Sequence, residues 1–173
     1  MADGLLFDVK DRNLDYTQSA IPVSKTNAAT GFHTDSTAAE YYPDIVGLLC
    51  LQPASEGGYS QIKNAVDLYY WIKQYYPEDI KLLSEPIIRD IITPGTPSSF
   101  EQIKHNRFPV FDFDSSGFIF RYMKYWIITG YEKSGISLPK GLSQALNRVD
   151  SYLNSQEHML MFKCELRAKH VSH

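Results

Sequence analysis

Two stretches of the chain carry apolar residues at the spacing of an amphipathic helix. In "LPKGLSQALNRVDSYLNS" one stripe is formed by Leu142, Ala145, Leu146, Val149, Tyr152 and Leu153. It predicts a helix over 140–154 that packs on a sheet, with Pro139 suited to its first turn. In "NAVDLYYWIKQYYPED" a second stripe is formed by Ala65, Leu68, Tyr69, Ile72 and Tyr76. Asn64 is the expected N-cap of that helix, and Pro77 ends it or begins a short helix over 77–85.

Other stretches have the patterns of strands. "DIVGLLCLQ" (44–52) is a short, nearly continuous apolar run before a proline, which favours a buried strand. A Gly-Gly turn and a second short strand follow in "PASEGGYSQI". "FPVFDFDSSGFIFRYMKYW" alternates around "DSSG" and predicts a hairpin over 108–122. "HMLMFKCEL" (158–166) is a further candidate strand.

The remaining segments complete the expected architecture. Residues 93–107 are polar and contain "TPGTPSS", which predicts a loop of the kind that covers a site. Strands mix with a few helices, and no alternation of strand and helix indicates a parallel sheet. We therefore expect a single domain over 1–173 that is mainly β, an antiparallel sandwich or barrel with flanking helices.

Composition narrows the classes of function. A chain of 173 residues with 43% hydrophobic and 21% charged residues is typical of a globular domain. The net charge of −3 and pI near 5.9 give no sign of a nucleic-acid or membrane partner. Cys50 and Cys164 form no CxxC pair, so a thiolate zinc site is not expected. The sequence has neither the pattern of a signal peptide nor an apolar run long enough to span a membrane, so the cytoplasm is the expected compartment.

The candidate chemistry lies in "GFHTDST", residues 31–37. Alternate residues of an extended segment point to the same side, so His33 and Asp35 can face one point with Thr34 turned away. An imidazole and a carboxylate so placed can fill two positions of a 2-His-1-carboxylate iron site, whose open positions take a co-substrate and O2. A hydrogen-bonded loop pair is the other interpretation of these two residues.

The surroundings of this pair extend the pattern. "GFHTDST…PDIVGLLCLQPASEGGYSQI", "RFPVFDFDSSGFIFRYMKYWI" and "GLSQALNRVDSYLNSQEHMLMFKCEL" together resemble the TauD/TfdA-like Fe(II)/2-oxoglutarate-dependent dioxygenases over about residues 5–166. The resemblance implies a double-stranded β-helix (jelly-roll) core, incomplete at both ends. It implies His33 and Asp35 as iron ligands, and Ser60 as a residue that helps to hold 2-oxoglutarate. The implied reaction is hydroxylation of a small molecule by O2, with 2-oxoglutarate converted to succinate.

The chain departs from the family pattern near its C-terminal end. The family's distal histidine and its 2-oxoglutarate-binding arginine follow a "GD…NN…LHGR" type of segment, whereas this chain reads "FKCELRAKHVSH". Three explanations are open: a truncated or frameshifted product of a longer gene, a catalytically inactive relative kept for binding, or a third ligand supplied by His170 or His173. Weaker candidates for a role in the site are His105, His158, Arg121 and Arg167. Two rival functions are a jelly-roll binding module without activity and a two-ligand metal hydrolase.

Overall fold

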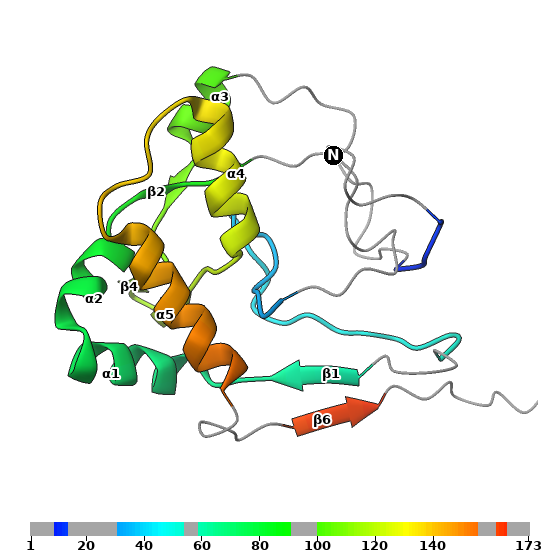
Figure 1. The fold of residues 1–173 in the computed structure, drawn as a ribbon. Coiled ribbons are helices and arrows are strands. Elements are labelled where there is room, and N and C mark those ends of the chain that lie inside the picture. Colours follow the sequence, from blue (N-terminus) through cyan, green and yellow to red (C-terminus); the bar gives the residue numbers. More distant parts are fainter. Residues whose placement is uncertain (1–8, 14–30, 54–58, 91–99, 156–161, 166–173) are drawn as a thin grey trace, which may run out of the picture.

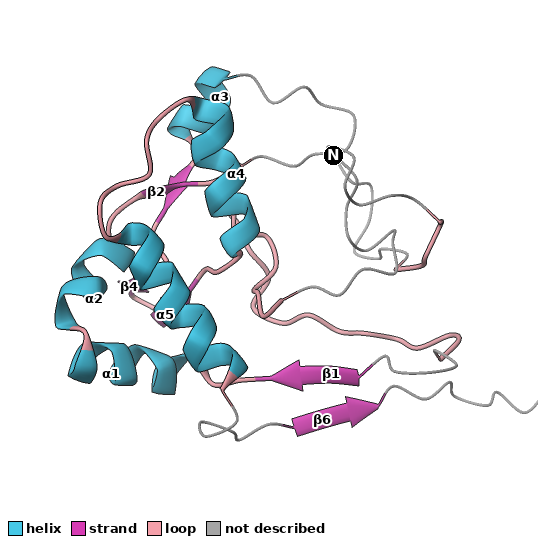
Figure 2. Cartoon of the chain, in the orientation of Figure 1, coloured by secondary structure: helices cyan, strands magenta, loops and turns pink. Residues whose placement is uncertain are grey.

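The computed structural model describes residues 9–13, 31–53, 59–90, 100–155 and 162–165 (Figures 1 and 2). Its helices are α1 (Ala65–Tyr75), α2 (Pro77–Leu83), α3 (Phe100–His105), α4 (Lys124–Ser134) and α5 (Leu142–Asn154). Its strands are β1 (Tyr59–Ile62), β2 (Ile87–Ile88), β3 (Arg107–Phe108), β4 (Phe111–Asp114), β5 (Gly117–Phe120) and β6 (Phe162–Glu165).

The strands pair antiparallel in three two-stranded sheets, β1–β6, β2–β3 and β4–β5. Among the described residues, more lie in helices than in strands. The predicted antiparallel pairing of the strands and the predicted helices are therefore confirmed. A mainly β architecture is not seen among the described residues. The predicted hairpin is confirmed, since β4 and β5 turn at "DSSG" and Phe111 pairs with Phe120. The strand predicted over 158–166 is confirmed at 162–165, and its other residues lie outside the described part of the chain.

The helices α1 and α2 begin as their sequences predict. The side chain of Asn64 accepts a hydrogen bond from the backbone N–H of Val66 at 2.9 Å, which satisfies a donor that the first turn leaves unpaired. Pro77 begins α2, where its missing N–H costs no hydrogen bond. Leu68 and Ile72 of α1 and Leu83 of α2 have no exposed surface, so both helices place their apolar face in the core.

Helix α5 buries its whole predicted stripe, with Leu146 and Val149 fully inaccessible. It packs on α1 and α2 (Figure 1), and its buried stripe shares one core with Ile87 of β2 and Phe111 of β4, so the helices, more than a sheet, form the surface on which it packs. The guanidinium of Arg148 reaches Asp79 of α2 at 2.6 Å and fixes the register of these helices.

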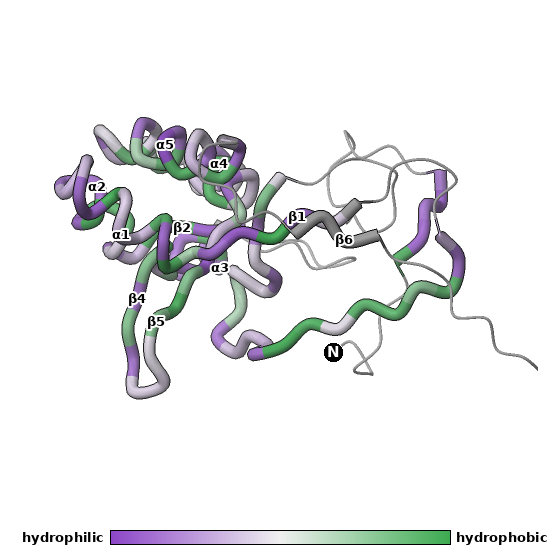
Figure 3. Tube along the Cα trace, turned by 90° about the horizontal axis from the view of Figure 1, so that it is seen from below, coloured by the Kyte–Doolittle hydropathy of each residue, from purple (hydrophilic) through white to green (hydrophobic). Residues whose placement is uncertain are grey.

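The apolar segment 44–52 does not form the buried strand that its composition favours. Its residues have no regular structure, and Ile45, Leu49 and Leu51 are 87%, 80% and 79% exposed. Figure 3 shows the segment as a hydrophobic stretch that runs apart from the helices. An apolar run shows only that burial of its side chains would be favourable. A buried strand also needs a partner strand, and no strand pairs with this segment within the described ranges.

Two further elements differ from the expected loops. The segment predicted as a loop over 93–107 contains helix α3 and the first residue of β3. Ile103 of α3 is buried, so this apolar side chain anchors an otherwise polar segment in the core. Residues 93–99 lie outside the described part. Helix α4 follows the hairpin, and its Gly130 lies so close to Arg89 and Asp90 that a Cβ there would be 2.7 Å from the backbone nitrogen of Asp90. The absence of a side chain at Gly130 thus allows α4 to pack on the end of β2.

Candidate metal and co-substrate site

His33 and Asp35 lie on one side of the segment that carries them. The Nε2 atom of His33 is 3.7 Å from the Oδ1 atom of Asp35, and their side chains are 31% and 54% exposed. The predicted arrangement of this pair, with side chains on a common side, is confirmed. They do not face the interior of a β-sandwich; they line an open cleft.

The orientation of the His33 ring is set by its own backbone. The Nδ1 atom is 2.8 Å from the carbonyl oxygen of Gly31, and a carbonyl can only accept, so Nδ1 carries the proton. The lone pair of the neutral ring is then on Nε2, the atom that faces Asp35. Metal-binding histidines are commonly held in this way, with one ring nitrogen donating to a carbonyl and the other free to bind.

Thr34 lies between the two candidate ligands, lines the cleft with them and is hydrogen-bonded to Tyr122, just after β5. Its backbone N–H donates to the carbonyl of Tyr122 at 2.8 Å, and its hydroxyl accepts from the backbone N–H of Tyr122 at 3.0 Å. Just beyond Asp35, Ser36 has φ of 55°, in the left-handed region that disfavours side chains with a Cβ. The chain therefore turns sharply directly after the pair, and such local strain is common at functional sites.

The cleft lies between this turn and the β4–β5 hairpin. It has a volume of about 490 Å³, and its walls come from residues 33–35, residues 42–44 and 46, and residues 114 and 116–121 of the hairpin and its end. Besides Asp35, two carboxylates line it, those of Asp44 and Asp114. Hydrogen bonds from Ser116 keep the pKa of Asp114 below its usual value, so this wall is negatively charged at neutral pH.

Arg121 also lines the cleft, just after the hairpin strand β5. Its guanidinium donates to the carbonyls of Ala39 at 2.5 Å and Glu40 at 3.4 Å, and lies between the rings of Tyr42 and Phe108. It therefore holds the segment that follows the His33–Asp35 turn against the hairpin. The sequence gives no sign of this role of Arg121, because the carbonyls that it contacts lie about eighty positions away in the sequence.

Arg89 supports the same wall from inside the core. It is fully buried and donates to the carbonyls of Phe108, Pro109 and Arg121 at 3.3, 3.0 and 2.8 Å. Burial, and secondarily the nearby charge of Arg121, lowers the pKa of Arg89 to about 9, so it stays charged at neutral pH. One guanidinium thus ties together three backbone carbonyls next to the cleft.

Of the other residues singled out from the sequence, the two that the structure describes do not line the cleft. Ser60 lies in β1, opposite Cys164 of β6, and does not line the cleft, so its role toward 2-oxoglutarate stays a prediction. His105 ends α3, is exposed and lies 3.7 Å from Glu101. The remaining candidates lie outside the described residues: His158, Arg167, His170 and His173. Within the described ranges, no group of three or more potential metal ligands occurs.

A comparison with family models gives a match over residues 3–166 to the taurine catabolism dioxygenase TauD, TfdA family. The chain belongs to the TauD/TfdA family. Members of this family are dioxygenases that in general use Fe(II), 2-oxoglutarate and O2, and act on small molecules. No curated protein matches the chain. None of the helices in the described residues is long and apolar enough to cross a bilayer.

Proposed function

We propose that this TauD/TfdA-family chain is a single Fe(II)/2-oxoglutarate-dependent dioxygenase domain with a jelly-roll core, acting on a small molecule in the cytoplasm. The observation that carries the proposal is the pair at the cleft: His33 Nε2 and Asp35 Oδ1 are 3.7 Å apart, and the Gly31 carbonyl holds the ring with Nε2 free. A neutral imidazole nitrogen and a carboxylate oxygen are donors that non-haem Fe(II) accepts.

The residues of the chain have distinct tasks in this proposal. His33 and Asp35 would hold the metal, and Ser60 would contact 2-oxoglutarate. Bound iron would supply the oxidative chemistry that converts a C–H bond, O2 and 2-oxoglutarate to an alcohol, succinate and CO2. The apolar side chains of Phe118 and Phe120 on the cleft wall limit water around a substrate.

Two fixed donors leave a metal exchangeable, so we expect weak Fe(II) binding unless His170 or His173 supplies a third ligand. Turnover of 2-oxoglutarate should be correspondingly poor. The rival function, a binding module without catalysis, is favoured by the absence of a third ligand among the residues that the structure describes.

Succinate release measured with Fe(II), ascorbate and 2-oxoglutarate tests the proposal. His33→Ala and Asp35→Asn should each reduce the rate by more than the factor of about 10–100 that loss of an outer-shell partner costs. His105→Ala, an exposed histidine away from the cleft, is the matched control and should leave the rate unchanged.

Two outcomes decide between the alternatives. A rate that His170→Ala or His173→Ala abolishes assigns the third ligand to that residue. Succinate formation that is no greater with this chain than with His33→Ala would contradict the dioxygenase function and favour the binding module.

A further inference from the structure

The residues on either side of His33 are both tied to helix α5. Thr34 exchanges two hydrogen bonds with the backbone of Tyr122, and the side chain of Tyr122 ends on α5. Phe32 packs near Lys63, whose ammonium lies 5.9 Å from the Phe32 ring centre and 5.8 Å from that of Tyr152 on α5. The histidine of the candidate metal pair is thus bracketed by two links to the same helix.

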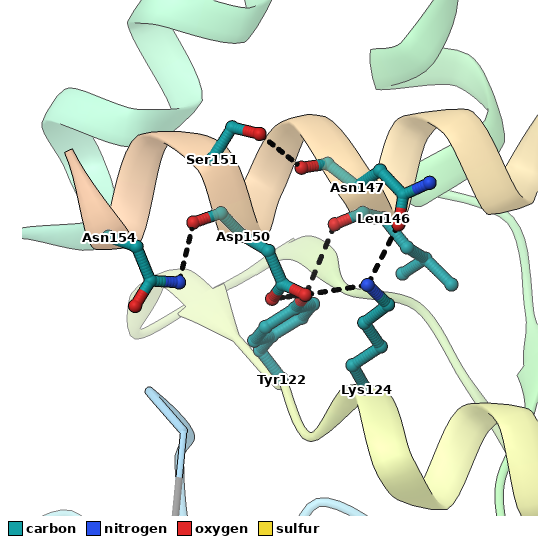
Figure 4. Close-up of polar contacts among 7 residues, drawn as sticks. All are labelled: Tyr122, Lys124, Leu146, Asn147, Asp150, Ser151 and Asn154. Atoms are coloured by element: carbon teal, nitrogen blue, oxygen red, sulfur yellow. Dashed lines mark hydrogen bonds and ion pairs between the residues drawn. The ribbon is translucent and has the colours of Figure 1, made fainter.

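The link through Tyr122 is the more specific of the two. The Tyr122 side chain has no exposed surface, and its hydroxyl donates to the carboxylate of Asp150 and lies 3.3 Å from the carbonyl of Leu146 (Figure 4). The second carboxylate oxygen of Asp150 accepts from Lys124 at 2.6 Å, and Lys124 also donates to Asn147 at 2.8 Å. Asp150 is therefore held in place while it fixes the Tyr122 ring.

The geometry connects this network to the direction in which the metal pair points. Because the backbone N–H and the hydroxyl of Thr34 both bond to the backbone of Tyr122, the position of Thr34 is set by Tyr122. His33 and Asp35, on either side of Thr34, both line the cleft, so the backbone that is held at Thr34 carries both candidate ligands. A displacement of Tyr122 would move Thr34 and, with it, both candidate ligands.

Lys63 supports the same helix end from the side of β1. Its ammonium donates to the carbonyl of Ser155, the C-cap of α5, at 2.7 Å, and to the carbonyl of Tyr152 at 3.3 Å, which also accepts from the backbone N–H of Ser155. Desolvation lowers the pKa of Lys63, in agreement with its position against two aromatic rings. This contact holds the end of α5 next to Phe32.

We propose that Asp150 is a positioning residue for the His33–Asp35 pair and acts through Tyr122 and Thr34. The proposal rests on the proposed function for its meaning in metal binding, but the positioning itself can be measured without metal. Outer-shell groups that orient ligands commonly change metal affinity by about 10–100-fold.

The first experiment observes the His33 imidazole by NMR in the metal-free, ¹⁵N- and ¹³C-labelled chain, assigned with His33→Ala. In Tyr122→Phe and Asp150→Ala the His33 ring resonances should move from their wild-type positions. In Asp150→Asn, which keeps an acceptor for the Tyr122 hydroxyl, they should stay at the wild-type positions. Val149→Ala removes buried side-chain volume from the same helix, and Ser151→Ala removes an exposed hydroxyl that only reaches Asn147 (Figure 4). Both controls should leave the ring resonances unchanged.

The second experiment titrates the same variants with Co(II) and follows its absorption bands. Asp150→Ala and Tyr122→Phe should weaken Co(II) binding by about tenfold, and Val149→Ala should not. Ring resonances that stay in place in Asp150→Ala, or that move equally in Val149→Ala, would overturn the positioning role and leave the proposed function intact. Shifted resonances in a chain that binds Co(II) no better than His33→Ala would support positioning and contradict the metal role of the pair.

Discussion

The hydroxyl of Tyr122 is buried and donates a hydrogen bond to the carboxylate of Asp150. Burial first, and then the hydrogen bond and charge of Asp150, raises the pKa of Tyr122 well above its ordinary value. The neutral hydroxyl is therefore the form that the folded protein stabilises, and its hydrogen bonds contribute to stability only while it keeps its proton.

This arrangement predicts how Tyr122→Phe depends on pH. At about pH 8 the variant should lose about 1–3 kcal/mol of unfolding free energy, because Asp150 loses a buried donor. Above about pH 10 Tyr122 loses its proton in the unfolded wild-type chain but keeps it in the folded protein, so the free energy of unfolding of the wild type falls as the pH rises. The variant has no hydroxyl at this position, so its free energy of unfolding does not fall for this reason. The difference between the two proteins should thus shrink from about pH 8 to about pH 11.

Chemical denaturation at several pH values checks this prediction. All other titrating groups, including Tyr152, are present in both proteins and cancel in the comparison. A difference that stays constant across this range would show that the Tyr122 pKa is not raised by folding.

At the scale of single elements, the stripe of α5 and the glycine of α4 are the features with the clearest energetic consequences. Leu146 is fully buried where α5 meets α1 and α2. Leu146→Ala should lower the free energy of unfolding by about 2–5 kcal/mol through lost burial and a residual cavity. Gln144→Ala, at an exposed position of the same helix, is the control for helix propensity, and a loss below about 0.5 kcal/mol for Leu146→Ala would contradict the packing.

Gly130→Ala tests the close approach of α4 to β2. An added Cβ would be 2.7 Å from the backbone nitrogen of Asp90 and 2.8 Å from the carbonyl carbon of Arg89, and neither backbone atom can move as a flexible side chain can. We expect a loss of about 1–3 kcal/mol, although alanine normally favours a helix over glycine. Thermal unfolding beside the exposed control Glu132→Ala measures it, and a stabilised Gly130→Ala variant would show that α4 does not pack in this way.

These elements also show what the sequence can predict. The α5 stripe and the "DSSG" turn depend on residues a few positions apart, so periodicity and turn chemistry were sufficient for them. Helix α4 lacks a clear apolar stripe, and its contact at Gly130 involves residues about forty positions earlier. Nothing local in its sequence indicates that contact.

At the scale of the whole molecule, the candidate site also has a part that the sequence predicts and a part that only the folded structure shows. The common direction of His33 and Asp35 follows from their spacing of two, and the sequence predicts it. The residues that hold them, Tyr122 and Asp150, lie 88 and more positions away in sequence from Thr34, so only the folded chain shows them together. The iron and 2-oxoglutarate roles of the pair and of Ser60 stay predictions.

The exposed apolar segment 44–52 has a consequence for how the protein behaves at high concentration. A run that is exposed, carries no charge over residues 45–51 and joins none of the sheets in the described part of the chain is a template on which further chains can add as β-strands, and such runs drive precipitation. Leu49→Lys, at a position 80% exposed, should raise the concentration at which the protein stays monodisperse by light scattering. Its free energy of unfolding should change by no more than about 0.5 kcal/mol. A variant that precipitates as readily as the wild type would place the source of self-association elsewhere, whereas an improved one makes this segment the first to alter for concentrated samples.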